Sequence, residues 1–393
     1  AERDIEGYVD LFDSSLREKT FPFWLDNAVD TENGGYIILP SFPDLEGEKV
    51  VPDPLVKTIV YHMRMMYGFS LAHASGYSTP ERDYLQAAKH GYDFIVENFL
   101  DPEFGGYYWA VDLSEDGNST DTRKFMHAQA FIIFSFLEYY RASGANDPCG
   151  RGREAVSVSP AMPVWDFEED WTPIGEPQAM GPLGTFGLKT SSPQLHLFEA
   201  FTELLVETGD DDVRGALQEV IDTNLQYFHP ENPGESTSSW TWNWTLVDES
   251  PNESYGTLAE IAYLFIRAQK ALGEEPDLDM YDAYLSYAIE SGYDQESEVG
   301  GLFDRGDKTW WANAEFLSSL AEYFETAGDD LYEDVLLSHL RFIECYAMDA
   351  EDGIWAWSLN GDGSVKQLDK VNMWKAAYHD VRALLKFIAA YSK

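Results

Sequence analysis

Residues 254–272 read SYGTLAEIAYLFIRAQKAL, and this stretch decides the fold. Its apolar residues recur with the spacing of a helix that buries one face. They are Leu258, Ile261, Leu264 and Phe265. Glu260 sits beside this apolar stripe, and a buried carboxylate is costly unless another group pairs with it. The stretch therefore raises the question of what Glu260 faces, and whether Thr257, one turn earlier, shares those surroundings.

Five other apolar helical stretches also carry one marked polar residue, and the six residues recur at a nearly constant interval. The set is Arg64, Gln129, His196, Glu260, Glu315 and His379. Successive members are 65, 67, 64, 55 and 64 residues apart. Such a period indicates a repeat architecture in which each unit is one supersecondary structure. Six units of two helices predict that these polar residues converge at one mouth of an inner ring.

Four of the units contain a related turn motif. Each motif has an acidic turn, then glycine, then aromatic or apolar residues, which predicts a short β-hairpin. The motifs are DTENGGYIILP from Asp30, DPEFGGYYWAV from Asp101, ESEVGGLFDRG from Glu296 and DAEDGIWAWSL from Asp349. The second helices of the units are predicted at YLQAAKHGYDFIVENFL, VRGALQEVIDTNLQYF, DMYDAYLSYAIESGY and LYEDVLLSHLRFIECY.

The predicted fold is all-α. Residues 1–393 would form a single (α/α)6 barrel of six helical hairpins, with short β-hairpins in the loops at one mouth. An open solenoid is the alternative, but it does not explain one polar residue per unit at a similar depth. Residues 145–187 are rich in Pro and Gly and lack a helical period, apart from MPVWDFEEDW. We interpret this segment as a long loop over the barrel and a candidate lid.

The charge of the chain is strongly one-sided, with 70 acidic and 26 basic side chains and a formal net charge of -44. Such a field repels nucleic acid and anionic membranes, so neither is an expected partner. The acidic residues are spread along the chain, as in ETGDDDVRG and TAGDDLYEDV. We interpret the excess as adaptation to high salt, where screening removes self-repulsion. An ordinary acidic protein is the alternative.

The sequence features that report on cellular location point to the cytoplasm. Cys149 and Cys345 lie far apart, which argues against a disulfide framework and fits a reducing compartment. No run of about 18 apolar residues is present, so no membrane span is expected. The opening residues AERDIEGYVD have no signal-peptide core. We therefore expect a cytoplasmic protein in the high-salt cytosol of a halophile.

The candidate chemistry lies in the predicted inner ring. The chain lacks nucleotide-binding glycine loops, HExxH, CxxC and histidine-rich metal spacing, so no cofactor or metal is expected. A guanidinium among methionines, as at Arg64, needs an anionic or hydroxyl-rich partner. Aromatic residues near the helix starts suit a sugar, whose C–H faces pack on aromatic planes, although core filling is the alternative. These residues are Tyr61, Trp310, Trp311, Trp355, Trp357, Trp374 and Tyr378.

Six segments, which follow one another along nearly the whole chain apart from 145–187, resemble the N-acylglucosamine 2-epimerase superfamily. They are FWLDNAVDTENGGY, FMHAQAFIIFSFLEYYRASG, SSPQLHLFEAFTELLVETGD, LAEIAYLFIRA, WWANAEFLSSLAEY and MWKAAYHDVRALL. This superfamily includes mannose and sulfoquinovose isomerases and cellobiose 2-epimerases. The resemblance implies an (α/α)6 barrel, a small sugar substrate and a monomer or homodimer.

The resemblance also implies roles for the matched residues. Arg64 would hold the sugar hydroxyls and the developing enediolate, and His379 would be the principal acid/base. His196 would be a pocket histidine, and Glu260 would orient a histidine. These four are the catalytic candidates. The substrate-binding candidates are Tyr61, His127, Gln129, Thr257, Trp310, Trp311, Glu315 and Trp374.

The chain departs from the family pattern at two of these positions. The fourth inner helix usually carries His three residues before the Glu, where this chain has Thr257, and His127 replaces what is often Tyr. Threonine cannot act as a base at neutral pH. With His379 as the single base, proton return to C1 would give a ketose, so we expect mannose isomerase-like aldose–ketose isomerisation rather than 2-epimerisation. Neither reaction needs a metal.

Two other functions stay open from the sequence. The first is an (α/α)6-barrel glycoside hydrolase or lyase that uses two carboxylates from Glu260, Glu315 and Asp380. The second is a sugar-binding relative without turnover.

Overall fold

The computed structural model describes residues 3–38, 54–114, 117, 120–144, 188–237, 239–241, 243–247, 254–328 and 331–392. The predicted loop at 145–187 lies outside the described residues, so the lid stays a prediction. No helix in the described ranges is long and apolar enough to cross a membrane.

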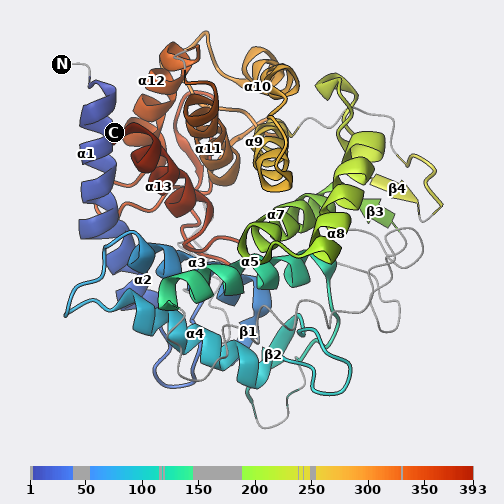
Figure 1. Ribbon diagram of the computed structural model, residues 1–393. Helices are drawn as coiled ribbons and strands as arrows, with labels where there is room; N and C mark the ends of the chain where they lie inside the picture. Colours follow the sequence, from blue (N-terminus) through green and yellow to red (C-terminus); the bar gives the residue numbers. More distant parts are fainter. Residues whose placement is uncertain are drawn as a thin grey trace.

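Six helices form a closed inner ring (Figure 1). They are α3 (Ile59–Ala74), α5 (Met126–Ser143), α7 (Ser191–Thr208), α9 (Tyr255–Leu272), α11 (Trp310–Ala327) and α13 (His379–Tyr391). Each packs on the next along the chain, and α13 returns to contact α3. Their side chains are buried around much of the helix circumference, as expected for helices enclosed on both sides. This ring confirms the predicted (α/α)6 architecture.

Amphipathic helices surround the ring. They are α1 (Ile5–Ser15), α2 (Phe21–Ala28), α4 (Tyr84–Asn98), α8 (Asp211–Thr223), α10 (Leu278–Gly292) and α12 (Glu333–Phe342). Short turns of π-helix extend three of these outer segments at Leu16–Thr20, Asn224–Phe228 and Ile343–Ala347, and a 3-10 turn spans Pro233–Glu235. Figure 1 shows α1 beside α13, where the first outer helix packs on the last inner helix.

The two sets of helices begin differently. Four outer helices start at an aspartate whose carboxylate accepts a backbone N–H of the first turn, which stabilises the helix start. These N-caps are Asp4, Asp83, Asp210 and Asp277. Most described inner helices begin without a side-chain cap bond. The first N–H groups of α3 and α11 instead donate to backbone carbonyls at the mouth of the ring, Ile59 to Trp109 and Trp310 to Trp357, each at 3.0 Å.

Short antiparallel strands lie at this mouth. The pairs are β1 (Val56–Thr58) with β2 (Ala110–Asp112), β3 (Leu188–Thr190) with β4 (Ser239–Thr241), and β5 (Lys308–Thr309) with β6 (Ser358–Leu359), which also pairs with β7 (Val365–Gln367). β1, β3 and β5 run directly into α3, α7 and α11. The strands thereby fix where these inner helices begin.

The four predicted turn motifs form hairpin turns closed by single antiparallel bridges. The bridged pairs are Val29–Tyr36, Leu100–Tyr107, Tyr293–Leu302 and Met348–Trp355. The paired glycines adopt positive φ, for example 84° and 65° at Gly34 and Gly35, a conformation that residues with a Cβ rarely adopt. The predicted hairpins are therefore confirmed within these motifs.

Each of these turns is held by a lysine from the segment that leads into the following inner helix. Lys57 bonds Asp30, Lys124 bonds Asp101 and Lys308 bonds Asp294, each at 2.6 Å. In the last unit Lys370 contacts Asp349 at 2.9 Å and Asp352 at 2.6 Å. The Lys57–Asp30 pair is 2% exposed on both sides. The acidic turn of the motif therefore accepts a cation that ties the outer hairpin to the inner ring.

We expect Lys57→Met to lower the free energy of unfolding by about 3 kcal/mol, because it leaves Asp30 buried without its cation. Urea denaturation in molar salt measures this loss. Lys89→Met is the matched control, since the Lys89–Asp93 pair is about half exposed (50% and 44%) and surface pairs contribute little. Equal small losses in both variants would contradict a structural role for the buried pair.

Candidate active site

Most of the ring residues predicted from the interval share one helical register. Arg64, His196, Glu260 and Glu315 are each the sixth residue of their helix, counted from Ile59, Ser191, Tyr255 and Trp310. All four are at most 5% exposed. They therefore lie at one depth inside the mouth, which explains the repeat interval. His379 differs, because it is the first residue of α13.

Gln129 does not belong to this register. It is the fourth residue of α5, and its amide accepts from the Tyr107 backbone N–H at 3.1 Å and donates to the Tyr107 carbonyl at 2.9 Å. Asn313 holds Leu302 in the same way, and His62 contacts the Tyr36 N–H. Gln129 therefore holds a hairpin turn. The predicted repeat interval had combined a residue at the fourth position of its helix with residues at the sixth position of theirs. The sixth position of α5 is Phe131.

Glu315 connects His379 to Arg382 and Tyr263, because all three side chains donate hydrogen bonds to its carboxylate. Its Nδ1 lies 2.5 Å from Glu315 Oε1, and Arg382 Nη2 donates to the same oxygen at 2.7 Å. Tyr263 donates to Glu315 Oε2 at 2.8 Å. Because Glu315 accepts, the neutral His379 ring carries its proton on Nδ1, and Nε2 holds the lone pair. Burial lowers the pKa of His379 to about 4, against the opposing effect of Glu315.

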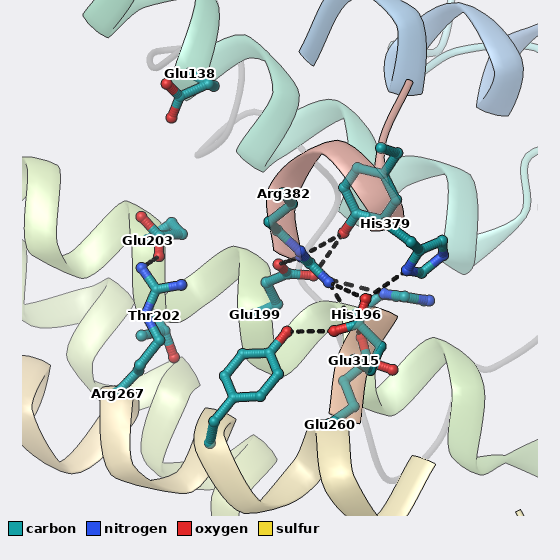
Figure 2. A network of polar contacts seen from close by, with 12 residues as sticks. Glu138, His196, Glu199, Thr202, Glu203, Glu260, Arg267, Glu315, His379 and Arg382 are labelled. Atoms are coloured by element: carbon teal, nitrogen blue, oxygen red, sulfur yellow. Dashed lines mark hydrogen bonds and ion pairs between the residues drawn. The ribbon is translucent and has the colours of Figure 1, made fainter. Parts of the chain in front are cut away.

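Arg382 is the centre of this network (Figure 2). Its Nη1 donates to Glu199 Oε1 and, at 2.7 Å, to the Tyr378 hydroxyl. The Tyr378 hydroxyl lies 3.2 Å from Glu199 Oε2. Arg382 overcomes the cost of burial at Glu199 and Glu315, so the pKa of Glu199 falls to about 2 and that of Glu315 falls well below its ordinary value.

Glu260 stands apart from these two ionised carboxylates. Its Oε1 lies 3.7 Å from Arg382 Nη2, and that oxygen has no hydrogen-bond partner in the structure. Burial, together with the negative charge of Glu315, raises the pKa of Glu260 well above its usual range. Thr257 does not pair with it, because the Thr257 hydroxyl lies 2.8 Å from Ser254 Oγ at the start of α9.

Two histidines form the wall made by α5 and α7. The His127 and His196 rings meet edge to face with centroids 4.5 Å apart. Burial lowers the pKa of both, so both are neutral near pH 7. His196 Nδ1 is 3.7 Å from Glu199 Oε2, and neither this nitrogen nor His127 Nε2 makes a hydrogen bond within the described part of the chain. This wall thus presents unpaired ring nitrogens inside a buried site.

Arg64 brings a buried positive charge to the ring. Its guanidinium lies over the rings of Phe131 and Tyr378, with the central carbon 4.7 and 5.2 Å from their centroids. Nη1 donates to the Trp374 carbonyl, and Nε has no hydrogen bond. Burial lowers the pKa of Arg64 to about 10, so it stays charged at neutral pH. No carboxylate of the described residues lies within ion-pair distance of it.

The predicted aromatic residues divide into two groups. Trp310 and Trp311 approach His379, with centroid distances of 6.2 and 6.3 Å, and Trp374 lies 6.0 Å from His127. These three line the ring of polar groups. Tyr61 is instead fully buried and donates to the Ile37 carbonyl at 2.9 Å. Its hydroxyl therefore holds the backbone after the first hairpin turn.

Salt bridges occupy the deeper end of the ring, below Arg382. Arg141 and Arg267 both bind Glu203, and Figure 2 shows the Arg267–Glu203 pair apart from the His379 network. A cavity of about 250 Å³ opens there, and Glu199 and Arg382 line it from the other side. The same two residues therefore separate the two ends of the ring.

Sequence reasoning left Glu199, Tyr263 and Arg382 out of the candidate set and named Tyr378 only among the aromatic residues that suit a sugar. Three of them follow a predicted residue by three positions, as Glu199 follows His196, Tyr263 follows Glu260 and Arg382 follows His379. A step of three residues keeps side chains on one helix face, one turn deeper. This spacing was the available signal for a second layer.

A metal ion at this site would compete with Arg382 for the same carboxylates. Ligand atoms of His196, Glu199 and Glu260 lie within 4.8 Å of one another, as a metal would require. Arg382, however, already binds Glu199 and lies near Glu260. The chemistry that these groups offer without a metal is proton transfer by neutral imidazoles next to a fixed cation, which suits a substrate that passes through an anion.

Fold and site together define an (α/α)6-barrel enzyme with acid–base chemistry. The profile of N-acylglucosamine 2-epimerase (GlcNAc 2-epimerase) matches residues 44–383. The chain therefore belongs to the N-acylglucosamine 2-epimerase family and is an isomerase of that family.

Individual relatives resemble the chain over most of its length. Cellobiose 2-epimerase from Dictyoglomus turgidum is 27% identical, over 95% of this chain and 96% of the relative. D-mannose isomerase from Thermobifida fusca is 23% identical, over 76% of each chain. The solved structure of cellobiose 2-epimerase from Bacillus thermoamylovorans superposes with a TM-score of 0.81 at 23% identity, covering 98% of this chain and 99% of that one, which shows the shared fold.

We expect the His379 imidazole to stay neutral from pH 8 down to about pH 5, because burial lowers its pKa to about 4. An imidazole with the ordinary pKa of about 6.5 would be roughly three-quarters protonated at pH 6. Ring signals of isotopically labelled histidine, assigned with His379→Ala, measure the titration. A midpoint near pH 6.5 would show that the buried environment does not control this group.

Proposed function

We propose that this chain epimerises C2 of the reducing-end sugar of a β-1,4-linked glucose disaccharide of the cellobiose type. The family supplies the reaction class, and the similarity to several cellobiose 2-epimerases supports the substrate class. His379, His196, Arg64 and Glu260 carry the chemistry. Trp310, Trp311, Trp374 and His127 contact the sugar.

The observation that carries this proposal is that the buried guanidinium of Arg64 has no carboxylate partner among the described residues. A buried charge without a counter-ion is costly, and the cost is repaid when an anion forms beside it. An aldose gives such an anion when C2 loses its proton, because the electron pair moves toward the carbonyl oxygen and forms an enediolate. Arg64 is therefore matched to the intermediate better than to the neutral sugar.

His379 is the base in this proposal. Its Nε2 takes the C2 proton, and the Nδ1–H bond to Glu315 stabilises the imidazolium that results. The low pKa of His379 ensures that the ring is neutral before the reaction. Its basicity would rise with the anion alongside it, since nearby negative charge favours the imidazolium. His196 and His127 are neutral hydrogen-bonding groups for the sugar oxygens.

The relatives do not support the sequence-based preference for aldose–ketose isomerisation over 2-epimerisation. That preference came from Thr257, which stands where the family usually has a histidine. Cellobiose 2-epimerases nevertheless match this chain over 95% of its length, whereas the D-mannose isomerase matches 76%. Ketose formation is therefore kept as an alternative outcome of the test below.

The hydrolase reading finds less support in the geometry. Glu315, one of its candidate carboxylates, is held by His379, Arg382 and Tyr263 at 2.5, 2.7 and 2.8 Å. A carboxylate with three donors is stabilised as an anion and is a poor general acid. Glu315 acts here as a partner of His379.

Incubation of the protein with cellobiose in deuterated buffer at molar salt tests the proposed function. We expect a product with mannose at the reducing end and deuterium at C2, seen by NMR and chromatography. His379→Ala should reduce exchange by at least about 100-fold, since a positioned base contributes 10²–10⁴. Ketose as the main product would support the isomerase alternative, and absence of exchange with released glucose would support a hydrolase.

Arg64→Lys tests the enediolate partner. We expect kcat to fall about 100-fold, because loss of a preorganised donor to a developing oxyanion costs 10²–10³ in rate. Folding should change little, since a cation is retained. Arg17→Lys on the outer segment, where the side chain is 48% exposed, is the control and should keep kcat. An unchanged kcat in Arg64→Lys would remove Arg64 from the transition state.

A further inference from the structure

Glu260 has a carboxyl oxygen, Oε1, that makes no hydrogen bond to any residue that the structure describes. The residue itself is 3% exposed. Its nearest ion-pair partner, Arg382 Nη2, is 3.7 Å away, which is beyond hydrogen-bond length. Glu199 and Glu315, by contrast, each receive direct hydrogen bonds from Arg382. Glu260 is therefore the one of the three carboxyl groups that Arg382 does not fix.

The residue one turn closer to the mouth, Thr257, does not supply a partner for Glu260 Oε1. Thr257 occupies that place on α9, but its hydroxyl lies 2.8 Å from Ser254 Oγ. Ser254 in turn donates to Asp304 Oδ1 at 2.7 Å, which holds the start of the helix. Thr257 is thus engaged toward the helix cap, and its short side chain does not hydrogen-bond Glu260.

The charges in the network favour a proton on Glu260. One guanidinium, Arg382, faces three buried carboxyl groups and binds two of them. A third negative charge at this site would be repelled by Glu199 and Glu315, which lie around the same arginine. Burial acts in the same direction and raises the pKa of Glu260. A proton on Glu260 removes this third negative charge and makes the side chain a carboxylic acid, which can donate a proton.

Glu260 and His379 belong to different walls of the ring. α9 carries Glu260 and α13 carries His379, with α11 and its Glu315 between them. Glu260 lies on the side of His196, whose ligand nitrogen is within 4.8 Å of a Glu260 oxygen. A sugar held between these walls has proton carriers on two sides.

We propose that Glu260 is the second proton carrier of the reaction and delivers a proton to C2 from the face opposite His379. This inference rests on the proposed function. The C2–H bond breaks, the proton goes to His379 Nε2, and the electron pair forms the enediolate. The Glu260 O–H bond then breaks, its proton bonds to C2, and the carbonyl reforms at C1. His379 is left protonated and Glu260 ionised, and exchange with water restores both.

The variant Glu260→Gln distinguishes proton transfer to the two faces of C2. It keeps the shape of the side chain but cannot transfer a proton. In deuterated buffer with cellobiose, we expect 2-epimer formation to fall by at least about 100-fold. Exchange of deuterium into C2 of unreacted cellobiose, or ketose formation, should stay within about tenfold of wild type, because His379 still removes and returns the proton on its own face. Glu260→Asp, which retains a carboxyl group with shorter reach, should restore part of the epimerisation.

Two results would overturn this role. The first is epimerisation by Glu260→Gln at the wild-type rate. The second is loss of epimerisation and exchange together in both variants while circular dichroism shows a folded protein, since Glu260 would then only position other groups. Glu322→Gln, at a buried glutamate that pairs with Lys270 and Lys386, is the control and should keep the ratio of epimer to exchange. Absence of exchange in the wild type would instead refute the proposed function itself.

Discussion

The binding of Glu199 and Glu315 by Arg382 is the interaction on which the rest of the site depends. These residues come from α7, α11 and α13, so one buried guanidinium joins three inner helices at the centre of the ring. Two carboxylates compensate the burial of Arg382, and Arg382 in turn keeps both ionised. Removing any one member would leave uncompensated charge inside the barrel, which is strongly destabilising. The network therefore fixes the helices and sets the protonation state of the groups around it.

The same network gives three glutamates of one ring three different surroundings. Glu315 is ionised and orients His379, Glu199 is ionised and anchors Arg382, and Glu260 is left with raised pKa and a free oxygen. Neutral histidines complete the set, because burial opposes their protonation. Hydrogen bonding and burial thus divide groups of one chemical type into two fixed anions and one carboxyl group with a raised pKa. With this division, the side chains of the ring could transfer protons at neutral pH, and the geometry does not require a bound metal for that.

The sequence predicted the ring because an apolar helix with one marked polar residue recurs in every unit and a related hairpin turn recurs in four of them. The acidic turns, the paired glycines and most of the helical stretches carried local signals and formed as predicted, although α13 begins only at His379, inside the segment MWKAAYHDVRALL. The register inside the ring was harder, because an interval near 65 residues does not distinguish the fourth from the sixth position of a helix. Gln129 was assigned to the site for this reason, although its amide holds Tyr107. Arg382 was missed because its partners lie 183 and 67 residues away, and only the closed ring brings them together.

The electrostatic design of the chain suits a neutral substrate with an anionic intermediate. A protein with a net charge of -44 would repel an anionic substrate, but an uncharged sugar enters its field without such a penalty. Inside the ring Arg64 supplies a positive charge that has no carboxylate partner among the described residues, and most of the inner helices begin without a side-chain cap. The enediolate would form at this point, where fixed positive groups are held in a low dielectric and act most strongly. The surface charge can therefore change with the salt content of the solvent. The reaction depends on a small buried region whose charges are set by its own contacts.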